Sequence, residues 1–222
     1  MGWLSQSLNS SIGKKFVMAV TGICLILFLI IHLLNNLSMY LGPEIYTEVV
    51  KNLDGIKPLI RVIELILAVV FFFHILNGAK LWWENRKARP EKYAVNGSSK
   101  NSSLFSRTMI QTGSIIIIFL ILHLQTMWYS FNFGSAHADH SYYYFVADSF
   151  HNSILLSVFY IVAVVLLGFH LNHGFQSAFQ TFGWNHKKYF PLIEKLGFIY
   201  SLIMAIGFAS IPVYFLFFYG GN

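Results

Sequence analysis

Four histidines lie inside long apolar stretches of this chain: His32, His74, His123 and His170. An ionisable side chain in such a stretch is costly, so it is a functional hypothesis by default when the stretch crosses a membrane. Imidazole can bind a metal or haem iron, can relay protons, or can hydrogen-bond a neighbouring carbonyl as a neutral core residue. Any single one of these histidines could be such a neutral core residue. Four histidines on four successive stretches favour a shared site.

Composition limits what kind of protein can hold these histidines. Of 222 residues, 56% are hydrophobic and only 11% are charged, whereas soluble domains average about 25% charged residues. This excludes an ordinary soluble enzyme, a disordered tail and a secreted disulfide scaffold. Cys24 is the single cysteine, so an internal disulfide, a cysteine-based zinc site and a CxxCH haem attachment are excluded as well.

The apolar residues gather in stretches long enough to cross a bilayer, for which about 20 residues suffice. There are five such stretches, at residues 16–35, 59–82, 109–127, 154–174 and 196–218. They predict an all-α membrane protein, a bundle of five transmembrane helices forming one transmembrane domain over residues 1–222.

The basic residues predict the orientation of the helices. All but three of the 15 Lys and Arg lie before the first span, around the connection between spans two and three, or between spans four and five, and the exceptions are Lys51, Lys57 and Arg61. Cytoplasmic loops of membrane proteins are enriched in Lys and Arg. The N terminus is therefore expected in the cytoplasm and the C terminus outside. The net charge of +6 indicates topology, and nucleic acid is not expected as a partner.

Helix direction then sorts the histidines into two levels. At about 1.5 Å per residue, His32 and His123 lie roughly 25 Å from the inner face, and His74 lies about 9 Å from it. His170 falls near the inner side too. Two imidazoles at one depth on different helices suit bis-histidine haem iron. A metal without haem would need three or four ligands at one level, and a proton relay would need carboxylates between the levels. We therefore expect two haems, about 15 Å apart by helix rise.

Other residues fit this interpretation less specifically. Small residues near the histidines could make room for a macrocycle, although each could equally serve ordinary helix packing; they are Gly22, Gly78, Gly113 and Gly168. Cations at suitable depths could hold haem propionates, although each could instead anchor the chain at the interface; they are Lys15, Lys80, Arg107 and Arg61.

Several strings resemble one known family, the five-helix, di-haem cytochrome b membrane subunit of succinate dehydrogenase and fumarate reductase. They are SSIGKKFVMAVTG (10–22), IHLLNNL (31–37), FHILNGAKLWWENRKARP (73–90) and HLNHGFQSAFQTFGWNHKKY (170–189). The resemblance covers nearly the whole chain. The intervals of 42, 49 and 47 residues between successive span histidines are also close to those of the family.

The resemblance implies that His74 and His170 bind a proximal haem b near the cytoplasm and that His32 and His123 bind a distal haem b. It implies an integral protein of the bacterial cytoplasmic membrane with two protein partners. One is a flavoprotein with FAD and the dicarboxylate site, and the other is an iron–sulfur subunit. The chain itself would have no catalytic residue for dicarboxylate chemistry. It would pass electrons to or from a membrane quinone, and the three-subunit complex would form a homodimer.

The quinone site is expected near the outer haem, with a carboxylate handling its proton. The candidates are Glu64, Asp54 and Glu48, and Glu64 could instead be only a partner of Arg61. Some fumarate-reducing relatives have a Glu two residues before the fourth-span ligand as a proton conduit, where this chain has Gly168. This departure favours succinate oxidation with menaquinone reduction.

Two other functions stay open at the level of sequence. The chain could be the di-haem cytochrome b of another quinone-linked dehydrogenase, such as a hydrogenase or a formate dehydrogenase. It could also be a transporter or structural anchor without haem, whose histidines are hydrogen-bonded core residues.

Overall fold

A computed structural model describes residues 2–88, 103–138 and 141–220. Over these residues all regular structure is helical. Five helical segments are long and apolar enough to cross a membrane: Ser11–Leu41, Lys57–Lys87, Met109–Ala138, Ile154–Thr181 and Phe190–Phe217. The predicted all-α bundle of five membrane-spanning helices is therefore confirmed. Of the basic residues that predicted the orientation, Arg89, Lys92 and Lys100 lie outside the described residues.

Four of the five spanning helices are longer than the apolar stretches that predicted them. The spanning helices are α2 (Ser11–Leu37), α4 (Lys57–Lys87), α7 (Met109–His123), α11 (Ile154–Thr181) and α12 (Phe190–Phe217). Short helices join or extend them: α1 (Trp3–Asn9), η1 (Ser38–Leu41), α3 (Pro43–Gly55), α6 (Leu104–Arg107), η2 (Leu124–Trp128), α8 (Tyr129–Asn132), α9 (Ser135–Ala138) and α10 (Tyr142–His151). In the third span, α7 is followed directly by η2 and α8.

Local sequence explains where several helices begin. Ser10 and Ser153 cap α2 and α11, each accepting a backbone N–H three residues on, as N-cap serines do. Proline near the first position starts α3, α4 and α12, where its missing N–H costs no hydrogen bond.

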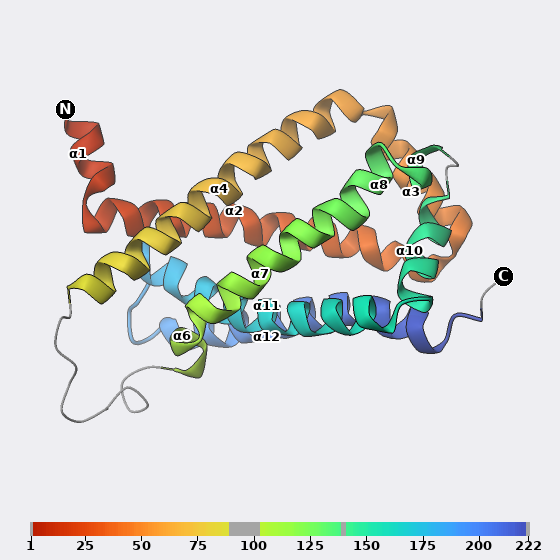
Figure 1. The fold of residues 1–222 in the computed structure, drawn as a ribbon. Coiled ribbons are helices and arrows are strands. Elements are labelled where there is room, and N and C mark those ends of the chain that lie inside the picture. Colours follow the sequence, from red (N-terminus) through yellow and green to blue (C-terminus); the bar gives the residue numbers. More distant parts are fainter. Residues whose placement is uncertain (1, 89–102, 139–140, 221–222) are drawn as a thin grey trace.

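Helices α11 and α12 form the most extensive helix pair, and Figure 1 shows them side by side along the bundle. Glycine permits this approach: a Cβ at Gly168 would lie 2.9 Å from Ala205 Cβ and 3.3 Å from the Ser201 carbonyl oxygen. Helix α2 packs on this pair and also on α4, and α7 packs on α11. No residue of α4 is buried, so α4 lies at the periphery of the described bundle.

The two ends of the bundle are built differently. At the end that holds α3, α9 and α10 (Figure 1), an aromatic cluster packs around Tyr142, Phe150 and Phe215. At the other end Lys14 of α2, itself buried, forms an ion pair with Glu84 of α4 at 2.6 Å. The bundle thus has a well-packed loop end and an opposite end where a charge pair joins two helices.

Candidate functional site

The structure places His74 of α4 beside His170 of α11. Their ring centroids are 6.3 Å apart, with 66° between the ring planes. These two residues are 96 positions apart in the sequence and come from helices of the same direction. They are the two histidines that depth along the helices assigned to the inner level.

His32 of α2 lies beside His123 of α7 in the same way. Their ring centroids are 5.8 Å apart and the planes are 83° apart. Phe28 stacks on His32 and Phe119 stacks on His123, in each case from four residues earlier on the same helix. The two histidines assigned to the outer level therefore also meet, and each ring has an aromatic support.

The helix rise gives the separation of the two levels. Thr21 of α2 contacts His74 of the inner pair, and His32 of the outer pair follows eleven residues later on the same helix. At about 1.5 Å per residue this is roughly 16 Å. The four histidines therefore form two separate pairs along the bundle.

Both pairs fit a group bound through two nitrogens. Two imidazoles that bind one ion from opposite sides, with metal–nitrogen bonds of about 2 Å, have ring centroids about 6 Å apart. Haem iron takes its protein ligands as one axial residue on each face. Over the described residues, no cluster of three or more His, Cys, Asp or Glu could hold a metal ion. Each pair thus offers two nitrogens, as a bis-histidine haem requires.

Hydroxyl groups on neighbouring helices hold the histidine Nδ1 atoms, and sequence reasoning missed them. Thr21 Oγ1 lies 3.1 Å from His74 Nδ1, Thr112 Oγ1 lies 3.4 Å from His170 Nδ1, and the Tyr160 hydroxyl lies 3.5 Å from His123 Nδ1. Ligating histidines usually donate their second ring nitrogen to such a partner. The contacts leave Nε2 of these rings as the nitrogen available to a ligand.

Only two of the four predicted glycines adjoin a histidine. A Cβ at Gly22 would lie 3.7 Å from His74 Cε1, and one at Gly113 would lie 3.5 Å from His170 Cε1. The neighbour of Gly78 is instead the Met18 side chain, and Gly168 packs against α12. The alternative of ordinary helix packing therefore describes Gly168.

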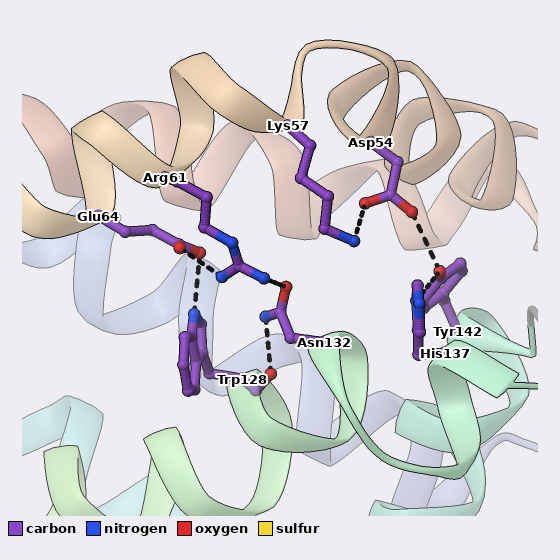
Figure 2. A network of polar contacts seen from close by, with 8 residues as sticks. All are labelled: Asp54, Lys57, Arg61, Glu64, Trp128, Asn132, His137 and Tyr142. Atoms are coloured by element: carbon purple, nitrogen blue, oxygen red, sulfur yellow. Dashed lines mark hydrogen bonds and ion pairs between the residues drawn. The ribbon is translucent and has the colours of Figure 1, made fainter.

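The carboxylate of Glu64 lies in a polar network at the outer end of α4 (Figure 2). It accepts from Arg61 at 2.6 Å and from Trp128 Nε1 at 2.8 Å. Arg61 also donates to Asn132 at 2.9 Å and lies over the Trp128 ring. Trp128 ends the π-helical turn η2 that directly follows His123, and such turns are frequent at functional sites. The network thus joins α4 to the segment after His123.

The other two carboxylate candidates lie in different surroundings. Asp54 pairs with Lys57 at 3.1 Å and accepts from the Tyr142 hydroxyl at 3.3 Å (Figure 2). Burial, together with the negative charge of Asp54, raises the pKa of Tyr142. Glu48 lines a hollow on the surface formed with Lys51, Tyr144 and residues of α3. The three candidates therefore do not converge on one point.

The cations proposed for propionates are spread over both ends. Lys15, Lys80 and Arg107 are exposed residues of the end that carries the Lys14–Glu84 pair. Arg61 lies at the other end, within the Glu64 network. Among the described residues, Lys15, Lys80 and Arg61 form no hydrogen bond or ion pair with a paired histidine.

One buried polar atom near the outer pair has no partner. Asn35 Oδ1 accepts no hydrogen bond from any described residue. Asn35 follows His32 by three positions and so lies on the same side of α2. An acceptor in this position could receive a hydrogen bond from a bound molecule.

Comparison with known proteins gives one match, to part of the chain. Residues 16–96, which are less than half of the chain and include His32 and His74, match the family described as "Succinate dehydrogenase/Fumarate reductase transmembrane subunit". Comparisons with curated proteins and with solved structures gave no match. Residues 16–96 of this chain, which has five helices long and apolar enough to cross a membrane, are therefore similar to that family of transmembrane subunits.

Proposed function

We propose that this chain is the membrane anchor and electron-transfer subunit of a succinate:quinone oxidoreductase, with two bis-histidine b haems. His74 and His170 would hold the inner haem, and His32 and His123 would hold the outer one. The observation that carries the proposal is the pairing itself, with centroid distances of 6.3 and 5.8 Å at two levels of one bundle. Bound there, the haems would supply one-electron carriers between the iron–sulfur subunit and the quinone.

The residues of the chain have defined tasks in this scheme. The four imidazoles orient the macrocycles, and the apolar helices exclude water from the path between the two levels. The dicarboxylate chemistry belongs to a flavoprotein partner with FAD, which an iron–sulfur partner connects to the membrane. The basic end of the bundle, with the inner pair closer to it, is the surface for these partners. By the positive-inside rule it faces the cytoplasm, in a bacterial cytoplasmic membrane.

Quinone binds at the outer end in this proposal, and Glu64 is the favoured proton-handling residue. Glu64 precedes His74 by ten residues on α4, about 15 Å along the helix, which places it at the level of the outer pair. Its partner Trp128 comes from the segment that directly follows His123. Asn35 Oδ1, buried without a partner near His32, supplies an acceptor for a quinol hydroxyl.

Gly168 bears on the proposed direction of electron flow. This position contacts Ala205 and Ser201 of α12 so closely that no side chain fits without a shift of helices. A carboxylate proton conduit at this position is thereby disfavoured. We propose succinate oxidation coupled to menaquinone reduction as the physiological direction.

Purification of the complex from its native membrane tests the proposal. The chain should copurify with a flavoprotein and an iron–sulfur subunit, contain two b haems by pyridine haemochrome assay, and have both haems reduced by succinate. Fewer than two haems per chain would contradict the di-haem site. Two haems that hydrogen or formate reduces and succinate does not would show that the chain serves another dehydrogenase.

A further inference from the structure

The inner histidines contact threonines that are equivalent in sequence. Thr21 and Gly22 of α2 face His74, and Thr112 and Gly113 of α7 face His170. Each Thr-Gly pair is followed, eleven residues after its threonine, by an outer histidine. The segments TGICLILFLIIH (21–32) and TGSIIIIFLILH (112–123) have the same residue at seven of twelve positions, including the phenylalanine that stacks on each outer histidine. The same arrangement, a Thr-Gly pair beside an inner histidine and an outer histidine eleven residues after the threonine, thus occurs on both α2 and α7.

The hydroxyl hydrogens of both threonines have acceptors on their own helices. Thr21 Oγ1 lies 2.7 Å from the Val17 carbonyl oxygen, and Thr112 Oγ1 lies 3.0 Å from that of Thr108. In both cases the carbonyl is closer than the histidine nitrogen, at 3.1 and 3.4 Å. A hydroxyl has one hydrogen and two lone pairs. With its hydrogen on the carbonyl, it offers the histidine a lone pair, so Nδ1 must be the donor.

A neutral imidazole that carries its hydrogen on Nδ1 has its lone pair on Nε2. We propose that Thr21 and Thr112 are positioning residues, which fix His74 and His170 as Nδ1–H tautomers and present both Nε2 atoms to one haem iron. This inference rests on the proposed di-haem function. It assigns to each inner ligand a specific partner on the neighbouring helix.

In the outer pair, no threonine contacts a histidine ring among the described residues. The hydroxyl near a ring nitrogen there is that of Tyr160, which lies 3.5 Å from His123 Nδ1. Among the described residues, no hydrogen bond to the His32 ring is present, and the ring packs against Phe28 and Phe208. A hydrogen bond from Nδ1–H makes the imidazole a more basic ligand and tunes the metal. The threonines therefore lower the midpoint potential of the inner haem selectively.

Isosteric substitutions in the intact complex test the proposal. Thr21→Val and Thr112→Val remove the hydroxyl and keep the shape, whereas Thr21→Ser and Thr112→Ser keep the hydroxyl. Thr181→Val is the matched control, because Thr181 bonds the Ser177 carbonyl on its own helix in the same way and lies eleven residues beyond His170. The readouts are the haem content, the midpoint potential of each haem and the electron paramagnetic resonance g values of the ferric haems.

The valine variants should raise the midpoint potential of the inner haem or weaken its retention about 10-fold or more. The outer haem should keep its potential, and the serine and Thr181→Val variants should match the wild type. The proposal is overturned if the valine variants leave the inner potential and retention unchanged, if both haems shift equally, or if the serine variants behave like valine. A wild-type complex without two haems would instead overturn the proposed function, so the two failures are distinguishable.

Discussion

At the scale of single residues, chemistry depends on what each side chain contacts. The sequence gives four histidines and three carboxylates as candidates, and contacts distinguish among them. The histidines meet in two pairs, whereas Glu64, Asp54 and Glu48 lie apart. Glu64 is both an ion-pair partner of Arg61 and the candidate nearest the segment that follows His123. Its structural and functional roles can be separated by experiment.

Glu64→Gln should slow succinate-driven menaquinone reduction about 100-fold, in the range expected for loss of a proton-transferring group. The glutamine keeps an acceptor for Trp128 Nε1, so haem content and haem reduction by succinate should stay as in the wild type. Quinone turnover and single-turnover haem reduction measure the two effects separately. Glu48→Gln, on α3, is the control and should be nearly silent. Unchanged quinone turnover in Glu64→Gln would mean that Glu64 has only a structural role, as the ion-pair partner of Arg61.

At the level of residues, the sequence predicted only those features that depend on how deep a side chain lies in the membrane. The rise of a helix fixes how far His32 or His74 lies from a basic loop, so the two levels follow from counting residues. The contact of Thr21 with His74 depends on how α2 is rotated against α4, which hydropathy does not encode. The repeated Thr-Gly and Phe-x-x-x-His spacing (residues 21–32 and 112–123) was the signal that could have found it.

At the scale of elements, glycines decide how closely the helices approach. Sequence could not separate glycines that face a histidine from those that face a helix, because both kinds sit among apolar residues. The structure places Gly168 between α11 and α12, where any Cβ meets Ala205. The π-helical turn after His123 was equally hidden, since Leu124–Trp128 has no proline or glycine to mark it.

Gly168→Ala should destabilise the bundle by about 1–3 kcal/mol, the usual cost of overpacking. An alanine in a helix is otherwise favoured over glycine by about 1 kcal/mol. A loss of stability in Gly168→Ala would therefore show that overpacking outweighs the helix propensity of alanine. The matched control is Gly174→Ala on the same helix, where a Cβ has nothing within 4 Å, and it should be neutral or stabilising. Thermal unfolding of the detergent-solubilised protein measures both. A stabilising Gly168→Ala would contradict the close packing of α11 on α12.

At the scale of the whole molecule, the scarcity of charge indicates a membrane location, and the positions of the cations are the basis of the proposed orientation. With 11% charged residues, the chain places its cations near the ends of its helices. The number of spanning helices could be predicted because each span must be both long and apolar. Their side-by-side arrangement could not, because apolar faces turned to lipid and to neighbouring helices have the same composition.

Cysteine labelling checks the proposed orientation. Ser135→Cys lies at the exposed first residue of α9, and Lys188→Cys lies in the exposed turn between α11 and α12. A membrane-impermeant maleimide added to spheroplasts with the outer face exposed should label the first variant and should reach the second only after lysis. The Cys24→Ser background removes the native thiol. The opposite labelling pattern would mean that the basic loops face outward.

The central claim is that the four histidines hold two haems in the pairs that the structure shows. Redox-resolved absorption spectra of the four single variants His32→Ala, His74→Ala, His123→Ala and His170→Ala, each purified as the intact complex, test it most directly. His74→Ala and His170→Ala should lose the same haem and largely keep the other, and His32→Ala and His123→Ala should show the reciprocal loss. Loss of one haem in common by His74→Ala and His32→Ala, or retention of both haems in any variant, would contradict the account.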